Sequence, residues 1–163
     1  MSTRPDPVAP ADAAARALAH DLMALPHAAL AYTDPETGTP GISRIAFGRA
    51  PTGQPMTLIS ALAPHFAALH AAPACALLLG EPGAKGDPLT HPRLMLRATA
   101  QFITPDDPCR PGLRSHWLQN HPKSKLYIDF ADFALVLFTP TEAVLNGGFG
   151  RAFRLGPADL QPR

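Results

Sequence analysis

The chain has 163 residues, of which 46% are hydrophobic and 17% charged, so it is long enough for one domain and too apolar to be disordered throughout. Its 14 Lys and Arg against 13 Asp and Glu leave a formal net charge of +1, which excludes the overall basic field typical of nucleic-acid-binding domains. Its longest apolar runs, such as residues 74–79, are far shorter than the roughly 20 residues that cross a bilayer.

The first regular element expected is a helix over residues 11–25. Leu18, Leu22 and Leu25 recur at helical spacing, and Pro26 ends the pattern. Residues 1–10 hold three prolines and no apolar segment typical of a signal peptide, and we expect them to form a disordered leader. The two cysteines form neither a CxxC motif nor a zinc-binding spacing, which favours a reducing, cytoplasmic location.

After the helix, the hydrophobic pattern changes to a period of two, which is typical of strands. Three strands are expected, with turn sequences at 34–38 and 51–55 between them. These connections are too short for a crossover helix, so we expect an antiparallel meander. The three strands cover residues 27–33, 41–48 and 56–60.

The remaining elements alternate helical and strand patterns. Helices are expected at 64–72 and 106–121, with a short helical turn at 125–130 and a loop at 80–91. The apolar strand 74–79 is predicted to be buried on both faces. The other predicted strands are 94–103, 133–138 and its partner 141–145, and a loose tail follows from residue 156.

This order of elements predicts a mainly β protein with flanking helices in one domain over residues 11–155. Six or seven short strands with inserted helices are typical of a small closed or nearly closed antiparallel β-barrel. The residue pattern alone names no function.

No motif for metal binding or nucleophilic catalysis is present. The seven histidines include no HxxxH or HExxH spacing, so we expect no metal site. No serine lies in a G-x-S-x-G motif, and the glycine-rich segments at 80–86 and 147–150 match neither a P-loop nor GxGxxG. Cys75 lies in an apolar strand and is expected to be a small core residue.

Three polar residues suggest an anion site. Arg44 lies in mid-strand, where its planar guanidinium suits a phosphate. Ser60 and His65 lie where a strand leads into the helix 64–72, and the N–H groups of a helix start favour an anion. A surface ion pair for Arg44, a cap for Ser60 and core packing for His65 are the alternatives.

Five segments together resemble the FMN-binding split-barrel family related to pyridoxamine-phosphate oxidase, and most closely its haem-iron-utilisation or general FMN-binding branch. The resemblance covers about residues 11–155, and its most specific parts are the last two segments. The segments are Gly41–Ile45, Leu58–His65, Gly86–Leu94, Leu126–Phe133 and Leu145–Ala152.

The resemblance implies a six- to seven-stranded antiparallel split β-barrel of the FMN-binding type, which forms a homodimer with cofactor sites at the interface. It implies that the FMN phosphate meets Ser43, Arg44, Ser60 and His65, and that the isoalloxazine lies against the backbone of Ile45, Ala61 and Leu62. Arg93 matches an arginine that opens the next barrel strand. The implied function is that of an FMN-dependent oxidoreductase of unknown substrate.

The sequence also departs from the family pattern. Many relatives have a basic residue, a Thr and an Asn where this chain has Ala61, Phe66 and Ala68, so several expected phosphate contacts are missing. The arginine–histidine signature of true pyridoxamine-phosphate oxidases is absent, so vitamin B6 oxidation is not expected. No histidine follows His121, whereas haem-degrading relatives use one near the C-terminus as a haem ligand. Two alternatives therefore stay open: a haem-binding or haem-utilisation protein, and a non-catalytic barrel that has lost its flavin.

Overall fold

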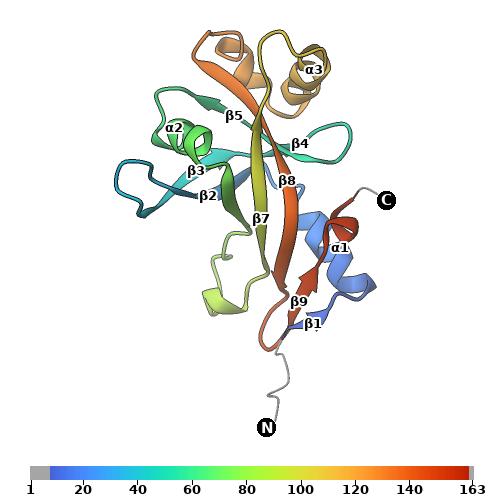
Figure 1. Cartoon of the computed structure of the whole chain (residues 1–163). Coiled ribbons are helices and arrows are strands. Elements are labelled where there is room, and N and C mark those ends of the chain that lie inside the picture. Colours follow the sequence, from blue (N-terminus) through green and yellow to red (C-terminus); the bar gives the residue numbers. More distant parts are fainter. Residues whose placement is uncertain (1–7, 162–163) are drawn as a thin grey trace.

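The computed structural model describes residues 8–161, which form a mixed sheet with three α-helices around it (Figure 1). The helices are α1 (Ala13–Leu22), α2 (Pro64–Ala71) and α3 (Arg110–Asn120), and three short 3₁₀ turns are η1 (Pro88–Thr90), η2 (Pro122–Leu126) and η3 (Pro157–Leu160). The strands are β1 (Ala9–Pro10), β2 (His27–Thr33), β3 (Pro40–Ala46), β4 (Gly48–Arg49), β5 (Pro55–Ser60), β6 (Ala74–Leu79), β7 (Arg93–Phe102), β8 (Phe133–Asn146) and β9 (Ala152–Leu155).

The sheet follows the order β1-β9-β8-β7-β6-β2-β3, and β5 pairs with both β4 and β8. Every pairing is antiparallel except that of β1 with β9. Seven strands have four residues or more. The prediction of a mainly β protein with flanking helices is therefore confirmed.

The sheet is open between β3 and β5. The buried hydroxyl of Thr57 on β5 donates a hydrogen bond of 2.6 Å to the carbonyl of Ala46 on β3, but no backbone ladder joins the two strands within residues 8–161. The predicted meander is correct for β2 and β3 and wrong for the third strand. That strand, β5, pairs with the two-residue strand β4 instead, because the chain leaves the β2–β3 ladder after Ala46.

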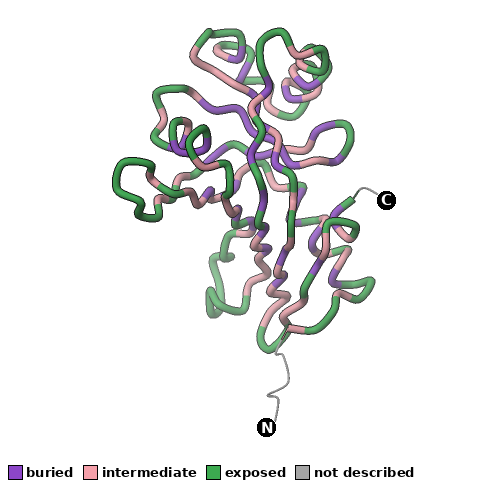
Figure 2. The backbone as a smooth tube through the Cα atoms, in the orientation of Figure 1, coloured by how far each residue is buried: buried purple, intermediate pink, exposed green. Residues whose placement is uncertain are grey.

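Two hydrophobic cores lie on opposite faces of β5 and the start of β8. The larger core is covered by α1, whose Ala19 and Leu22 pack among inward residues of the long strands. The smaller core lies under α3 and contains Trp117, which is 1% exposed. Neighbouring residues of β5 point alternately to the two cores, Leu58 into the smaller and Ile59 into the larger. Figure 2 shows that the buried residues concentrate where these strands cross.

The strand at 74–79 is present as β6, but the prediction that both its faces are buried is wrong. Leu77 and Leu79 are in the core, whereas Ala74 and Leu78 on the other face are exposed. The strand buried on both faces is β5, whose first five residues are all buried. The continuous apolar run in β6 therefore did not predict its burial, because β5 lies between two cores whereas one face of β6 is uncovered.

The predicted pair of strands at 133–138 and 141–145 is a single strand, β8. A β-bulge accommodates the break in pattern, because Arg97 on β7 pairs with Glu142 while the next residue, Ala98, pairs with Pro140. Thr141 is the extra residue at the bulge, and its hydroxyl donates to the carbonyl of Arg97 at 3.3 Å. The true partner after the turn at 147–151 is β9.

Helix boundaries also differ from the prediction. Helix α1 ends at Leu22 rather than residue 25, and its N-cap is Asp12, which accepts a hydrogen bond of 2.7 Å from the amide of Ala15. Helix α3 begins at Arg110 rather than 106, since Asp107 holds a turn there by accepting from the amide of Cys109 at 2.8 Å. The predicted turn at 125–130 is η2 and the turns after it.

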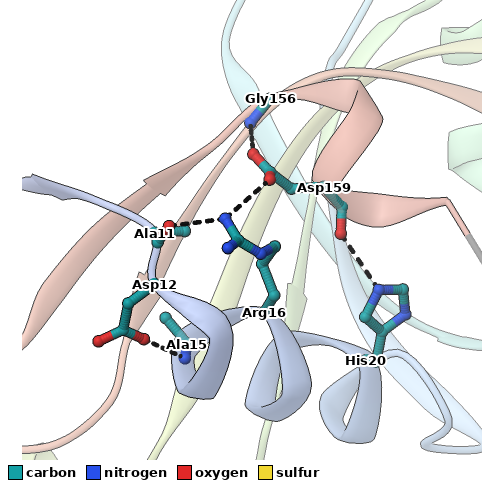
Figure 3. A network of polar contacts seen from close by, with 7 residues as sticks. All are labelled: Ala11, Asp12, Ala15, Arg16, His20, Gly156 and Asp159. Carbon is teal, nitrogen blue, oxygen red and sulfur yellow. Dashed lines mark hydrogen bonds and ion pairs between the residues drawn. The ribbon is translucent and has the colours of Figure 1, made fainter. Parts of the chain in front are cut away.

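The two ends of the described chain are held together rather than loose. Ala9–Pro10 of the expected leader pair with β9, and residues 157–160 of the expected tail form η3, which carries the buried Leu160. Figure 3 shows the contacts that fix η3 to α1: Arg16 pairs with Asp159 at 3.3 Å, and His20 donates to the carbonyl of Asp159 at 3.1 Å. Residues 1–7 of the leader lie outside the described residues.

None of the helices in residues 8–161 combines the length and the apolar character needed to span a membrane.

Gly80 lies where the end of β6 packs closely against the start of β7. Its φ is +111°, and a Cβ there would lie 2.5 Å from the carbonyl oxygen of Pro92. Gly80→Ala should therefore destabilise the fold by more than the ~1–3 kcal/mol typical of backbone strain alone. The control is Gly86→Ala, since Gly86 also has a positive φ of +84° but nothing within 4 Å. Urea unfolding should rank the two losses in that order, and equal losses would contradict the close packing.

Candidate functional site

Strand β3 separates two of the predicted site residues onto opposite faces. Ser43 is half-buried on the face that carries the buried Ile45. Arg44 points to the outer face, where its side chain is 76% exposed and pairs with Glu81 at 3.3 Å. Glu81 also lies 3.3 Å from the ring of His27. The surface ion pair considered for Arg44 is therefore present, and an exposed pair of this kind exchanges partners at little cost.

The loop between β5 and α2 has its own hydrogen-bond partners. The Ser60 hydroxyl donates to the carboxylate of Asp132 at 2.9 Å and accepts from the amide of Leu62 at 3.2 Å. The amide of Ala61 donates to the carbonyl of Asp132 at 2.6 Å, and that of Ala63 to the carbonyl of Ser60 at 3.0 Å. The N–H groups predicted to cradle an anion are thus mostly engaged, with a carboxylate beside them.

His65 is buried at the start of α2. Its side chain is 8% exposed, and its Nδ1 is the one buried side-chain polar atom of residues 8–161 without a hydrogen-bond partner. Its ring lies 5.9 Å from that of Tyr32 on β2, and burial lowers the pKa of His65 below its ordinary value. Core packing, one of the two interpretations weighed for His65, is confirmed, and the unpartnered Nδ1 leaves the other in place.

The remaining predicted residues lie on several elements and differ in exposure. Ile45 is 4% exposed, so only its backbone could face a ligand. Leu62 is 88% exposed beside the exposed Ala61. Arg93, at the start of β7, donates to the carbonyls of Leu89 and His91 in its own loop, at 3.0 and 3.4 Å, and so braces that loop.

Comparison with known proteins shows which proteins share this arrangement. No family model matches the sequence. The non-canonical heme oxygenase HOZ, chloroplastic, of Arabidopsis thaliana is 31% identical over 118 residues, which are 71% of this chain and 34% of that protein. The chain therefore spans about a third of the length of this curated relative.

Solved structures extend the likeness to nearly the whole chain. The protein Atu2129 of Agrobacterium tumefaciens, of unknown function, is 31% identical with a TM-score of 0.78, covering 92% of this chain and 60% of that one. A heme binding protein from Mycobacterium smegmatis is 23% identical with a TM-score of 0.76, covering 97% and 61%. An F420 reductase is 21% identical with a TM-score of 0.56, covering 76% and 94%.

The chain has the split-barrel fold of these proteins. The opening between β3 and β5 is the split of this barrel, and it lies among the residues that the sequence resemblance had selected.

The split barrel does not assemble the predicted phosphate cradle in a single chain. Ser60 and the amides after it are committed to Asp132 and to each other, and a carboxylate disfavours a phosphate dianion at the same place. Two of the residues that depart from the family pattern pack inside the fold. Ala68 is fully buried, and the ring of Phe66 packs edge-on against that of Phe102, with ring centres 5.0 Å apart. These residues fit a phosphate poorly.

Sequence reasoning missed Asp132 as a site residue, although it lies in the Leu126–Phe133 segment that carried the resemblance. It also missed the apolar outer face of the sheet, which we define by two cross-strand rows. Arg44 and Arg97 are charged members of these rows, and the others are mostly Ala, Leu, Met, Val and Ile. The rows are Arg44–Ala29–Leu78–Met95–Val144 and Ile42–Ala31–Ala76–Arg97–Glu142.

Other candidate groups are excluded by their contacts. Within residues 8–161 no cluster of three metal-ligating side chains exists. Both ring nitrogens of His91 are engaged, one by the amide of Gly83 and the other by the carbonyl of Lys85. Burial raises the pKa of the Cys75 thiol to about 11, so this cysteine stays protonated and inert, as expected for a core residue.

Burial of neutral His65 should make stability depend on pH. Because its pKa is lowered in the folded state from 6.5, the unfolded chain takes up a proton first as the pH falls. Stability is therefore full above about pH 6.5 and is lost below it, at no more than ~1.4 kcal/mol per pH unit. His65→Phe removes this contribution, so unfolding free energies at about pH 7.5 and 5.5 should differ less in the variant. An equal difference in both proteins would contradict the assignment.

Proposed function

We propose that the chain binds haem at the split between β3 and β5. The proposal rests on three features of the split: exposed apolar side chains, the exposed Arg44, and the carboxylate of Asp132, which already accepts a hydrogen bond from Ser60. Ile42 is 71% exposed, Leu62 88% and Phe130 57%. Exposed apolar side chains are typical of binding surfaces where they form a contiguous patch.

The chemistry of haem matches these groups better than that of FMN. Its macrocycle is a flat apolar surface, and its two propionates are single carboxylates that one arginine pairs with well. A phosphate dianion needs several convergent donors, and Asp132 holds those of the β5–α2 loop. The names of two relatives, a heme oxygenase and a heme binding protein, support the same ligand.

In this proposal Arg44 exchanges Glu81 for a propionate. Leu62 and Phe130 belong to segments that the Ala61–Asp132 hydrogen bond joins, and both present apolar side chains to solvent. We propose that they contact the macrocycle from the β5 side of the split while Ile42 contacts it from β3.

Flavin is the second candidate, and one observation favours it. The unpartnered Nδ1 of His65 lies at the start of α2, where the family resemblance expects a phosphate contact. An FMN-dependent oxidoreductase of unknown substrate would follow from flavin binding, because the flavin itself carries the electron chemistry.

A haemin titration followed by visible absorption distinguishes the two ligands. The full chain should give a saturable Soret band, and Arg44→Gln should weaken haemin binding by about tenfold. Arg16→Gln is the control, since Arg16 on α1 is also paired with a carboxylate, Asp159 at 3.3 Å, and is not part of the split or the outer face, so this variant should bind as the natural chain does. Tight FMN uptake without haemin uptake would replace haem by flavin, and uptake of neither would refute both.

We further propose that a second copy of the chain covers the apolar outer face, as the family resemblance implies. Leu78 is 41% exposed at the centre of its row, between Ala29 and Met95. A two-fold interface uses the same surface on both copies, so the apolar side chains of this face would pack against those of the second copy.

The molar mass in solution tests this interface. Light scattering should show a dimer, and Leu78→Glu should convert it to a monomer with an unchanged far-ultraviolet spectrum. Leu89→Glu is the control, because Leu89 is 70% exposed on η1 and not part of the outer face, so this variant should stay dimeric. A monomeric natural chain would refute the interface.

A further inference from the structure

A second cavity lies away from the split, between the C-terminal end of α1, the β3–β4 junction and α3. Its volume is about 320 Å³, at the lower end of the range of about 300–1,000 Å³ for small-molecule pockets. Its apolar lining comes from Met23, Leu25, Pro26 and Phe47. Figure 1 shows α1, β4 and α3 on one side of β7 and β8, whereas α2 lies on the other.

The polar lining of this cavity has cationic or neutral groups and no acidic ones. It consists of Arg49, His116, Asn120 and His121. Arg49 is half-buried, and its guanidinium donates to two carbonyls, that of Gly53 at 2.9 Å and that of Leu160 at 3.5 Å. No carboxylate of residues 8–161 lies within ion-pair distance of it.

The guanidinium of Arg49 therefore loses hydration through burial, and no carboxylate of residues 8–161 balances its charge. Burial lowers the pKa of Arg49, which is the direction expected when a cation loses water without gaining an anion. Carbonyl groups satisfy its N–H donors but leave its net charge unbalanced. A half-buried cation that lines a cavity free of acids is complementary to an anion.

His121, another lining residue, is held by two contacts. The ring of His121 donates to the carbonyl of Phe47 at 2.9 Å and stacks on Trp117 with ring centres 4.0 Å apart. A Cβ at Gly48 would lie 3.2 Å from the Trp117 ring, so a larger residue there would require that ring to move by a few tenths of an ångström. His116, by contrast, is half-buried with no hydrogen bond to its imidazole from any described residue.

We propose that this cavity is a binding site for a small organic carboxylate with an apolar body. Arg49 pairs with the carboxylate, the lining from Met23 to Phe47 contacts the apolar body, and the free imidazole of His116 and the amide of Asn120 supply further donors. One arginine balances one carboxylate. The apolar lining favours such a ligand over inorganic phosphate, which has no apolar part. This site is independent of haem or flavin at the split.

Calorimetric titration of the full chain with benzoate tests the proposal, with benzamide as the uncharged counterpart of the same shape. Benzoate should bind saturably and at least about tenfold more tightly than benzamide. Arg49→Gln should weaken benzoate binding by about tenfold or more, whereas Arg44→Gln, at the split, should leave it unchanged. Equal binding of the two probes, or an Arg49→Gln variant that binds as the natural chain does, would overturn the proposal.

A second variant keeps the test decisive if loss of Arg49 disturbs the fold. Ala24 is exposed and lines the cavity, so Ala24→Trp should occupy the cavity while keeping Arg49 in the chain, and it should abolish benzoate binding. In the natural chain, benzoate should shift amide NMR signals of residues 47–49 and of α3. Shifts confined to β3 and α2, or full binding by Ala24→Trp, would place the carboxylate elsewhere and refute this site.

Discussion

The rest of the structure depends on one long strand, β8, which belongs to both halves of the molecule. Its first residues pair with β5 while its last pair with β9, and β7 follows it along most of its length. The bulge at Thr141 turns the strand without ending it. Because β5 and the start of β8 have a hydrophobic core on each face, they position α1 on one side and α3 on the other.

This arrangement also produces the split. Strand β5 pairs with β8 on one edge and with the short β4 on the other, so β3 pairs with β2 alone among the described strands and its other edge is open. The residues that flank the opening are then decided by two local networks. Glu81 holds Arg44 on the outer face, and Asp132 holds the β5–α2 loop. An anion at the proposed site would compete with these two carboxylates, because Glu81 already pairs with Arg44 and Asp132 already accepts the hydrogen bond of Ser60.

The two proposed sites use arginine in different ways. Arg44 is exposed and already paired, so a ligand there competes with Glu81 at small cost and gains mostly from apolar contact. Arg49 is half-buried and has only carbonyl partners, so an anion there offsets a charge that the fold leaves unbalanced. A protein with both would bind a flat cofactor at the split and a small acid some distance away.

The sequence by itself determined the class of fold, because alternation and turn residues act over a few positions. The strands at 27–33 and 94–103 follow from such local patterns, and the family resemblance named Ser60 and its neighbours as expected cofactor contacts. Local pattern could not show that Ser60 donates to Asp132, 72 positions away, nor that residues 133–146 form one strand across a bulge. It could not show which face of β6 lacks a cover, since Leu77 and Leu78 are equally apolar and only the layers above them differ. Tertiary structure decided these points because each depends on what packs against a residue, whereas the fold class depends on the order of residues along the chain.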